Sequence, residues 1–301
     1  MSISKCNIEI GINHQELNHH GNSFFPIAIY KDDLQRDCVP WHWHGEIEII
    51  VITKGKLKIK SGTNTFIINK GDGIFINSEV LHSVYSKEGE SGELFSIVFH
   101  PRLVGGNSDS IYFSKYLAPI IKDQSLNNIL LNASIDWQKE IIDYVIDAHK
   151  LCSLENNGYE FKVRDDISNI ILTIFNNKSS KKTITSQKAI RDSKRSKNML
   201  NYICNHYVEN ISVEQIASSS NISESEALRC FKNTIGTTPM QYVINYRLQK
   251  ASELLIYSSL KIIEISLDCG FGEASYFSKR FKEKYKVTPE NFRENYKADN
   301  L

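Results

Sequence analysis

Between residues 26 and 100, short apolar stretches alternate with clusters of Gly, Asn, Ser and Asp that favour turns. Over residues 56–60, lysines take every second position, and Leu57 and Ile59 take the positions between them. A repeat of two is the spacing of a strand with one solvated face. The pattern therefore predicts a small antiparallel barrel or sandwich. Its expected strands are residues 47–53, 56–60, 65–69, 73–76 and 94–99.

After Pro101 the apolar positions follow a different repeat. Residues 135–154 and 159–175 place apolar side chains at i, i+3, i+4 and i+7, the spacing along one face of a helix. These stretches predict a helical hairpin that turns at Gly158. Two interpretations of the hairpin stay open. It offers a dimerisation surface, or it only closes the apolar bottom of the barrel.

Residues 178–196 interrupt the helical pattern. They are rich in Lys and Arg, include the single acid Asp192 and hold few large apolar side chains, so we expect a linker. From residue 197 the helical repeat returns, with capping boxes that begin at Ser212 and Ser223. We expect helices that start near Lys197, Val213, Glu224, Met240, Lys261, Glu273 and Pro289.

Two segments of this helical part share one layout. In each, a short helix and a tight turn precede a second helix with phenylalanine on one face and basic residues on the other. This is the layout of a helix-turn-helix, whose second helix reads the DNA major groove. The two units span residues 213–234 and 262–285. Residues 240–257 predict a helix of about 27 Å between them, a rigid spacer for two readers about one turn of DNA apart.

Composition separates the two parts further. The chain has 301 residues, enough for two domains, and a net charge of only +1. Residues 186–301 hold 17 Lys and Arg against 13 Asp and Glu, and the preceding residues are mildly acidic. This basic excess is compatible with polyanion binding but is too small for binding through phosphates alone.

Other features of the sequence limit its setting. No apolar run approaches the roughly 18 residues that cross a bilayer, and the first residues lack a signal-peptide pattern, so we expect a cytoplasmic protein without membrane contact. The cysteines form no C-x-x-C pair, which argues against a thiolate zinc site or a disulfide framework. We expect reduced thiols at Cys6, Cys38, Cys152, Cys204, Cys230 and Cys269.

The last hundred residues carry a series of short motifs. They include Gln215-Ile216-Ala217, Ile235-Gly236, Tyr246-Arg247-Leu248, Gly270-Phe271, Ser275-Tyr276-Phe277-Ser278 and Thr288-Pro289. In these motifs the chain resembles the DNA-binding domain of the AraC/XylS family of bacterial transcription regulators. The resemblance implies a homodimer whose partners are double-stranded promoter DNA, a small-molecule effector and RNA polymerase.

The resemblance also implies which residues meet DNA. The base-reading positions of the family fall on Ser225, Leu228 and Arg229 in the first unit and on Ala274, Ser275 and Lys279 in the second. Of the basic side chains, Arg229 suits a bidentate contact to guanine, whereas Lys232 and Lys282 suit phosphates.

Two positions depart from the family pattern. The leucine usual at the position of Ala227 has moved to Leu228, which then either contacts DNA or fills the core. Lys286 replaces a glycine at a helix end, where a left-handed cap costs a side chain on the order of 1 kcal/mol.

The N-terminal half carries a second set of candidate residues. The first cupin motif is matched by His42, His44, Glu48 and Gly55, and the second by Gly71 and His82, with Asn77 and Glu79 in place of its Pro and Gly. On one strand, His42, His44 and Glu48 would share a face and point into the barrel. With His82 they form a candidate site for Zn, Fe, Mn or Ni. The interpretation that we favour is a metal-free pocket in which Tyr30 joins these four residues around a polar effector such as a sugar.

The expected architecture is a two-domain α+β protein. A cupin domain, a double-stranded β-helix barrel with its helical hairpin, takes residues 1–177 for ligand sensing and dimerisation. Residues 178–196 form the linker, and residues 197–301 form an all-α domain with two helix-turn-helix motifs. We assign His14, His19 and His20 to a mobile polar arm.

The expected function is effector-dependent, sequence-specific regulation of transcription, without catalytic residues and without a required cofactor. The alternative is a metal-dependent cupin enzyme, an isomerase or oxygenase, that carries the helices as an appendage.

Overall fold

The computed structural model describes residues 16, 20–34, 38–62, 64–86, 91–123, 125–178 and 187–299. The chain divides into two compact units, Met1–Ser193 and Lys194–Leu301. The first unit is rich in strands and the second is helical, as the sequence predicts. None of the described helices is both long and apolar enough to cross a membrane.

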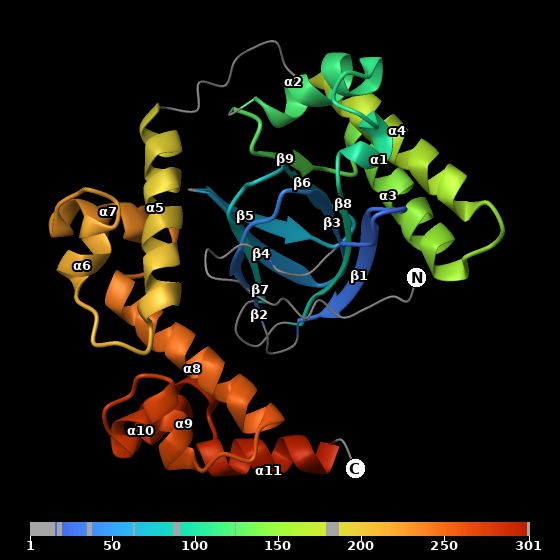
Figure 1. Cartoon of the computed structure of the whole chain (residues 1–301). Helices are drawn as coiled ribbons and strands as arrows, with labels where there is room; N and C mark the ends of the chain where they lie inside the picture. Colours follow the sequence, from blue (N-terminus) through green and yellow to red (C-terminus); the bar gives the residue numbers. More distant parts are fainter. Residues whose placement is uncertain are drawn as a thin grey trace. The chain divides into compact units, whose positions relative to one another are not determined.

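Two antiparallel sheets form the centre of the first unit (Figure 1). The larger sheet has the order β1 (Ile27–Asp33), β8 (Glu93–Phe99), β3 (Ile47–Lys54), β6 (Gly73–Ile76) and β9 (Asn128–Leu131). The smaller sheet has the order β2 (Cys38–His42), β7 (His82–Ser86), β4 (Lys56–Ser61) and β5 (Asn64–Asn69). The five expected strands are confirmed as β3, β4, β5, β6 and β8, whereas the sequence pattern missed the other four.

The two sheets pack face to face through aliphatic side chains. Ile50 and Ile52 of β3 lie in one buried cluster with Leu57 and Ile59 of β4. The lysines that alternate with Leu57 and Ile59 point away from this cluster, so the predicted solvated face of β4 is confirmed. Facing sheets are the arrangement that the cupin motifs predict, and their closure into a barrel stays a prediction.

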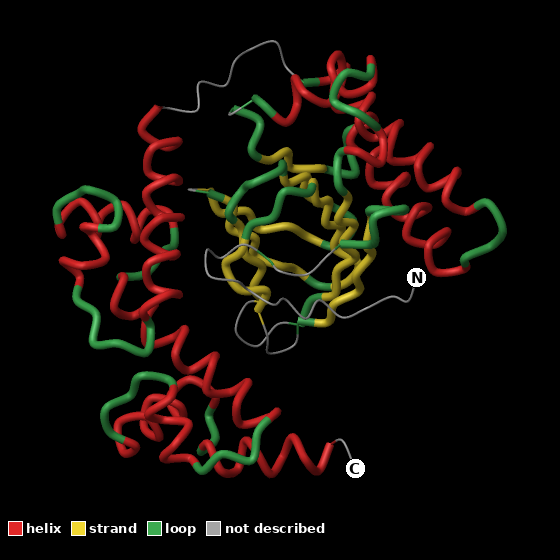
Figure 2. The backbone as a smooth tube through the Cα atoms, viewed as in Figure 1, coloured by secondary structure: helices red, strands yellow, loops and turns green. Residues whose placement is uncertain are grey.

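Helices cover the outer face of the larger sheet (Figure 2). Three short helices, α1 (Arg102–Gly105), η1 (Tyr112–Leu117) and α2 (Ala118–Ile121), precede the hairpin of α3 (Asp136–Leu154) and α4 (Tyr159–Asn177). Ile49 and Phe75 of the sheet share a buried cluster with Val145 of α3 and Ile170 of α4. The hairpin therefore covers the apolar side of the sheet, and its second role, as a dimerisation surface, stays a prediction.

Helix α5 (Gln187–His206) begins earlier than the sequence predicts. The expected start near Lys197 is wrong, and the second half of the expected linker is helical, while residues 179–186 lie outside the described residues. The buried positions of α5 explain the error. Asp192 and Ser196 take them in its first turns, and apolar Met199 and Ile203 take them only later. An apolar repeat is therefore missing where the helix starts.

Six further helices complete the second unit. They are α6 (Val213–Ser218), α7 (Glu224–Thr234), α8 (Pro239–Tyr257), α9 (Ile262–Asp268), α10 (Ala274–Tyr285) and α11 (Pro289–Asp299). The capping box at Ser212 is confirmed, because its side chain accepts from the Gln215 N–H and the Gln215 side chain accepts from the Ser212 N–H. Ser223 likewise accepts a bond from the Glu226 N–H. The two helix-turn-helix units are thus α6–α7 and α9–α10.

Helix α8 is the predicted spacer between the two units. Its 19 residues correspond to a length of about 28 Å. Leu248 and Leu255 of α8 lie in the same core as Phe277 and Phe281 of α10. On another side of α8, the Arg247 guanidinium donates to the Tyr207 carbonyl at 2.6 Å and to the Glu209 carbonyl at 2.7 Å. These contacts fix α8 between its neighbours.

Lys286 ends α10 in the left-handed conformation that the sequence predicts. Its φ is 65°, and its N–H bonds the Lys282 carbonyl. A side chain in this region costs on the order of 1 kcal/mol relative to glycine, so the chain tolerates a small local strain at this cap.

Candidate DNA-binding surface and sensor pocket

Four candidate residues of α7 lie on one face of the helix. Ser225, Leu228, Arg229 and Lys232 follow the i, i+3, i+4, i+7 spacing, and the opposite face buries Ala227, Cys230 and Phe231. Leu228 is 39% exposed and Ala227 is fully buried. Leu228 therefore lies on the outer face of α7, and Ala227 takes the buried position.

Helix α10 presents a similar face. Ser275, Lys279 and Lys282 are exposed, and Ala274 is half-buried at the first turn. Phe277 and Phe281 are fully buried on the opposite side. In both second helices, buried phenylalanine thus anchors the helix to its domain and turns the cationic residues outwards.

Arg229 already has a planar, bidentate partner within the protein. Its Nη2 lies 2.7 Å from Glu226 Oε1, and its Nε donates to Glu226 Oε2 at 3.1 Å. The same carboxylate accepts from Arg195 Nη1 of α5 at 3.0 Å. Sequence reasoning missed Glu226, although its position three residues before Arg229 is the spacing of a helical ion pair. The guanidinium fork is therefore already paired with a carboxylate, in the bidentate geometry that it could also offer to the edge of a guanine.

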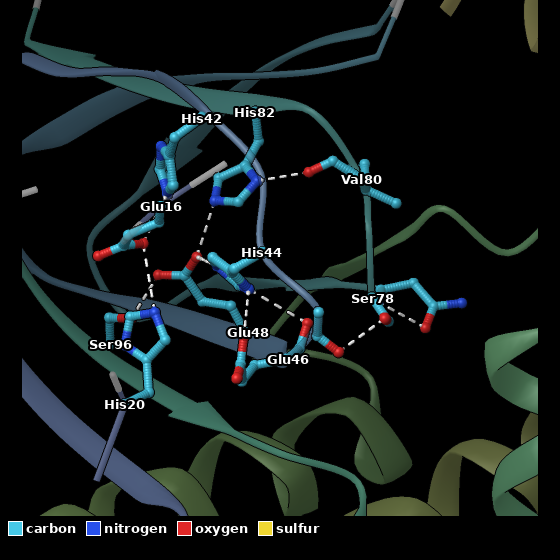
Figure 3. A network of polar contacts seen from close by, with 12 residues as sticks. Glu16, His20, His42, His44, Glu46, Glu48, Ser78, Val80, His82 and Ser96 are labelled. Carbon is cyan, nitrogen blue, oxygen red and sulfur yellow. Dashed lines mark hydrogen bonds and ion pairs between the residues drawn. The ribbon is translucent and has the colours of Figure 1, made fainter. Parts of the chain in front are cut away.

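The candidate pocket residues come together between the two sheets (Figure 3). His42 ends β2, His82 begins β7 and Glu48 lies in β3, while His44 lies in the connection between β2 and β3. The expectation of one continuous strand through His42, His44 and Glu48 is wrong, because β2 ends at His42 and β3 begins at Ile47. The turn between β2 and β3 nevertheless brings the side chains of His42, His44 and Glu48 together with His82. One ligand atom of each of the four residues lies within 4.8 Å of the others.

Glu48 is the centre of the hydrogen bonding in the pocket. Its Oε2 lies 2.9 Å from His82 Nε2 and 3.4 Å from His44 Nε2. Its Oε1 accepts from the Ser96 hydroxyl at 2.5 Å. Burial alone would raise the pKa of Glu48, but the hydrogen bonds from the two histidines outweigh it and lower the pKa well below its usual value. Glu48 is thus an ionised carboxylate in a buried site.

Backbone carbonyls accept hydrogen bonds from the Nδ1 atoms of His42, His44 and His82. The Nδ1 atoms of His42 and His82 lie 2.8 Å from the carbonyls of Pro40 and Val80. His44 Nδ1 lies 3.2 Å from the Glu46 carbonyl. A carbonyl can only accept, so each Nδ1 donates. Nε2 of His44 or His82 donates to Glu48 when its ring carries a second proton, and it presents a lone pair to the centre when the ring is neutral. Burial and the two neighbouring histidines lower the pKa of His42 well below its usual value, which favours that neutral form.

Two residues that precede β1 close this pocket. Glu16 Oε2 lies 3.2 Å from His20 Nε2 and 3.7 Å from His42 Nε2. His20 Nδ1 lies 2.9 Å from the hydroxyl of Tyr30, so the predicted pocket residue Tyr30 is present through this bond. The Glu16 N–H donates to the Trp43 carbonyl at 2.9 Å. The burial of these side chains was not predicted from the sequence.

The assignment of His20 to a mobile arm is wrong, because its side chain is only 1% exposed. Burial lowers the pKa of His20, but the nearby carboxylates of Glu16, Glu46 and Glu48 outweigh it and raise the pKa overall. The other two histidines of the proposed arm, His14 and His19, lie outside the described residues.

The space that remains between these side chains is small. The cavity has a volume of about 10 Å³ and is lined by the histidines, Glu16, Glu48 and Tyr30. That volume holds about one water molecule or one ion and is far too small for a sugar. Three imidazole nitrogens and a carboxylate are a donor set that suits Zn²⁺, Fe²⁺, Mn²⁺ or Ni²⁺. The residues present therefore fit a divalent transition-metal ion.

Comparisons with known proteins identify the family. Residues 24–139 match the AraC-like ligand binding domain, and residues 216–295 match a helix-turn-helix domain. The chain is 31% identical over 294 residues to the HTH-type transcriptional regulator YdeC of Bacillus subtilis (strain 168), covering 95% of this chain and 98% of that protein. The chain belongs to the AraC family of transcription regulators. This AraC family member is a DNA-binding regulator with a ligand-binding domain, as its motifs predict.

Other transcription factors match a smaller part of the chain. The lactose operon transcription activator of Staphylococcus xylosus is 32% identical over 101 residues, 34% of this chain and 36% of that protein. The DNA-binding domain of AdpA, a global transcriptional factor solved in complex with a target DNA, is 25% identical with a TM-score of 0.34. That similarity covers 35% of this chain and 95% of the AdpA chain.

The cysteines follow the prediction where they are described. Cys152, Cys204, Cys230 and Cys269 are buried thiols that form no disulfide with one another. Burial raises the pKa of Cys152 to about 11 and those of Cys204 and Cys269 to about 12, so these thiols stay protonated and unreactive at neutral pH. Cys6 and the side chain of Cys38 lie outside the described residues.

Proposed function

We propose that this regulator reads double-stranded promoter DNA with α7 and α10 in successive major grooves and responds to an effector in the pocket between its sheets. The proposal rests on a feature that α7 and α10 share. Each helix exposes a face with basic residues and buries phenylalanine on its opposite face. The base-reading residues would be Ser225, Leu228 and Arg229 on α7 and Ala274, Ser275 and Lys279 on α10. Lys232 and Lys282 would bind phosphates and set the register.

The effector pocket would be formed by Tyr30, His42, His44, Glu48 and His82. Its lining is polar and offers both donors and acceptors, which suits a polar effector such as a sugar. Because the cavity holds only about 10 Å³, a sugar would enter only after Glu16 and His20 withdraw from it. A ligand that favours one arrangement of these residues over the other would shift the balance between two states of the regulator.

The remaining partners follow from the same proposal. A homodimer would form through the α3–α4 hairpin, where Ile146, Phe161 and Leu172 leave apolar side chains 44%, 78% and 43% exposed. RNA polymerase would be recruited at the bound promoter, and the regulator would act in the cytoplasm, where bacterial promoter DNA lies. The relationship to a regulator over nearly the whole chain supports a binding role for the pocket and not a catalytic one.

Replacing His82 with glutamine tests whether the pocket binds the effector while the second unit alone binds DNA. A DNA fragment is first selected from a random library with the purified chain, and a thermal-shift screen of sugars identifies compounds that raise the melting temperature. We expect His82→Gln to abolish that rise, because it removes the bond to Glu48, and to leave affinity for the selected DNA unchanged. His206→Gln, an exchange at a half-buried histidine of α5 outside the pocket, is the matched control and should change neither measurement. If His82→Gln abolishes DNA binding in a folded protein, the pocket is not a separate effector site.

A further inference from the structure

Glu16 and His20 are more deeply buried than residues that only cover a polar pocket need to be, and one carboxylate oxygen of Glu16 has no hydrogen-bond partner among the described residues. Both side chains are almost fully buried, at 2% and 1% exposure. Glu16 Oε1 makes no hydrogen bond to any described residue. A buried carboxylate oxygen without a partner is costly, so proteins keep such an atom where a cation or a water completes it.

The pair also adjoins the histidines of the pocket. One ligand atom each of Glu16, His20 and His44 lies within 4.8 Å of the others, and His44 belongs equally to the group with His42, Glu48 and His82. In Figure 3, Glu16 and His20 face the same space as His42 and His44. The two groups therefore form one continuous set of six donor side chains around a cavity of about 10 Å³.

We propose that Glu16 and His20 are ligands of a divalent transition-metal ion that the pocket histidines and Glu48 hold, so that the ion ties the chain ahead of β1 to the sheets. The inference rests on the proposed role of this pocket as the regulatory site and adds a metal ion that holds the pocket closed until the effector enters.

The chemistry of the six side chains supports a transition metal over other ligands. Four imidazoles favour zinc, iron, nickel or copper over magnesium and calcium, which prefer oxygen donors. The carboxylates of Glu16 and Glu48 are oxygen donors that can offset the charge of one divalent cation in a buried volume. Each of His42, His44 and His82 donates from Nδ1 to a backbone carbonyl, and such bonds orient metal-binding histidines in other proteins.

Because Glu16 is bonded to the chain next to β2, an ion bound to Glu16 would also hold the segment ahead of β1 against the sheets. The Glu16 N–H bonds the Trp43 carbonyl, and Trp43 lies between His42 and His44. An ion shared by Glu16 and these histidines would therefore strengthen a contact that the backbone already makes. Loss of the ion would weaken the hold on Glu16 and His20 and open the pocket to a larger ligand.

Cobalt binding to the full chain tests the inference. The protein is treated with a chelator and titrated with Co²⁺, with calorimetry for affinity and visible absorption for the ligand field. We expect one high-affinity Co²⁺ in the wild type, a loss of affinity of roughly 10- to 100-fold in Glu16→Gln/His20→Gln, and a changed spectrum. The control His206→Gln/Glu209→Gln removes a His–Glu pair of 2.9 Å that is exposed and should bind Co²⁺ like the wild type. Exchange of the Glu16 amide should slow on Co²⁺ addition in the wild type and the control.

Two results would overturn the inference: a wild type that does not bind Co²⁺ at micromolar concentration, or a double variant with unchanged Co²⁺ affinity and spectrum. The single variants His20→Gln and Glu16→Gln keep the test valid if the double variant does not fold. Binding to the selected DNA, measured in the same samples, separates the two proposals. A Co²⁺-dependent change in DNA affinity supports both, whereas Co²⁺ bound through Glu16 and His20 with unchanged DNA affinity supports the metal site and refutes the regulatory role of the pocket.

Discussion

Replacing Arg229 with alanine is expected to weaken binding to the selected DNA by about 5- to 150-fold, which corresponds to about 1–3 kcal/mol. The reason is geometric. Its guanidinium lies on the outer face of α7 and already makes a bidentate contact, at 2.7 and 3.1 Å, with the Glu226 carboxylate. The two acceptors of a guanine edge would replace that carboxylate in the complex. The preference for guanine at one base pair should fall with the affinity.

Further variants separate base reading from simple charge. Arg229→Lys keeps the positive charge and loses the planar fork, so it should recover part of the affinity but not the guanine preference. Lys250→Ala removes a cation from another i, i+3 ion pair, with Glu253 on α8, and should leave DNA binding unchanged. Binding is measured by fluorescence anisotropy at one fixed salt concentration. An Arg229→Ala protein with wild-type affinity and base preference would show that α7 does not read DNA through this residue.

Replacing Gly270 with alanine is expected to destabilise the second unit by on the order of 3 kcal/mol. Gly270 lies in the turn between α9 and α10 with φ of +76°. A Cβ atom there would lie 2.6 Å from the Val208 carbonyl oxygen and 2.7 Å from that of Tyr207. Both obstacles are backbone atoms that cannot rotate away. The left-handed strain and the clash therefore add.

Calorimetry of the full chain measures this effect. The transition of Lys194–Leu301 should move down by about 10–25 °C, because each kcal/mol shifts a domain of this size by about 4–8 °C. Gly272→Ala is a matched control in the same turn, since a Cβ atom at Gly272 has nothing within 4 Å. That variant should melt close to the wild type. Equal melting temperatures for the two variants would mean that the second turn is not packed against Tyr207 and Val208.

The helices of the DNA-binding unit could be predicted almost completely from the sequence, because capping residues and the apolar repeat mark where they begin and which sides they bury. Ser212 and Thr238 cap the helices that the pattern predicts, and phenylalanines mark the buried sides of α7 and α10. The error at α5 has the opposite cause. Among the α5 side chains that the structure describes, the first buried ones are Asp192 and Ser196, and polar residues at buried positions give no periodic signal.

The sensor pocket was predicted in its residues but not in its structure. His42, His44, Glu48 and His82 do come together, yet through a turn between two strands and not along a single strand. Glu16 and His20 were missed because their burial depends on contacts with residues far along the chain, and a short polar stretch carries no sign of such contacts. Strand β2 was missed because it contains Pro40, and β9 because it lies outside the strand-rich stretch of residues 26–100.

Hydroxyl-radical footprinting on the selected DNA tests the central claim most directly. If α7 and α10 enter successive major grooves, the wild type should protect two patches on one face of the duplex, about 10 base pairs apart. Lys279→Ala together with Ser275→Ala should remove only one patch, and Arg229→Ala should weaken only the other. A single protected patch, or two patches that fade together in every variant, would contradict reading by two helices.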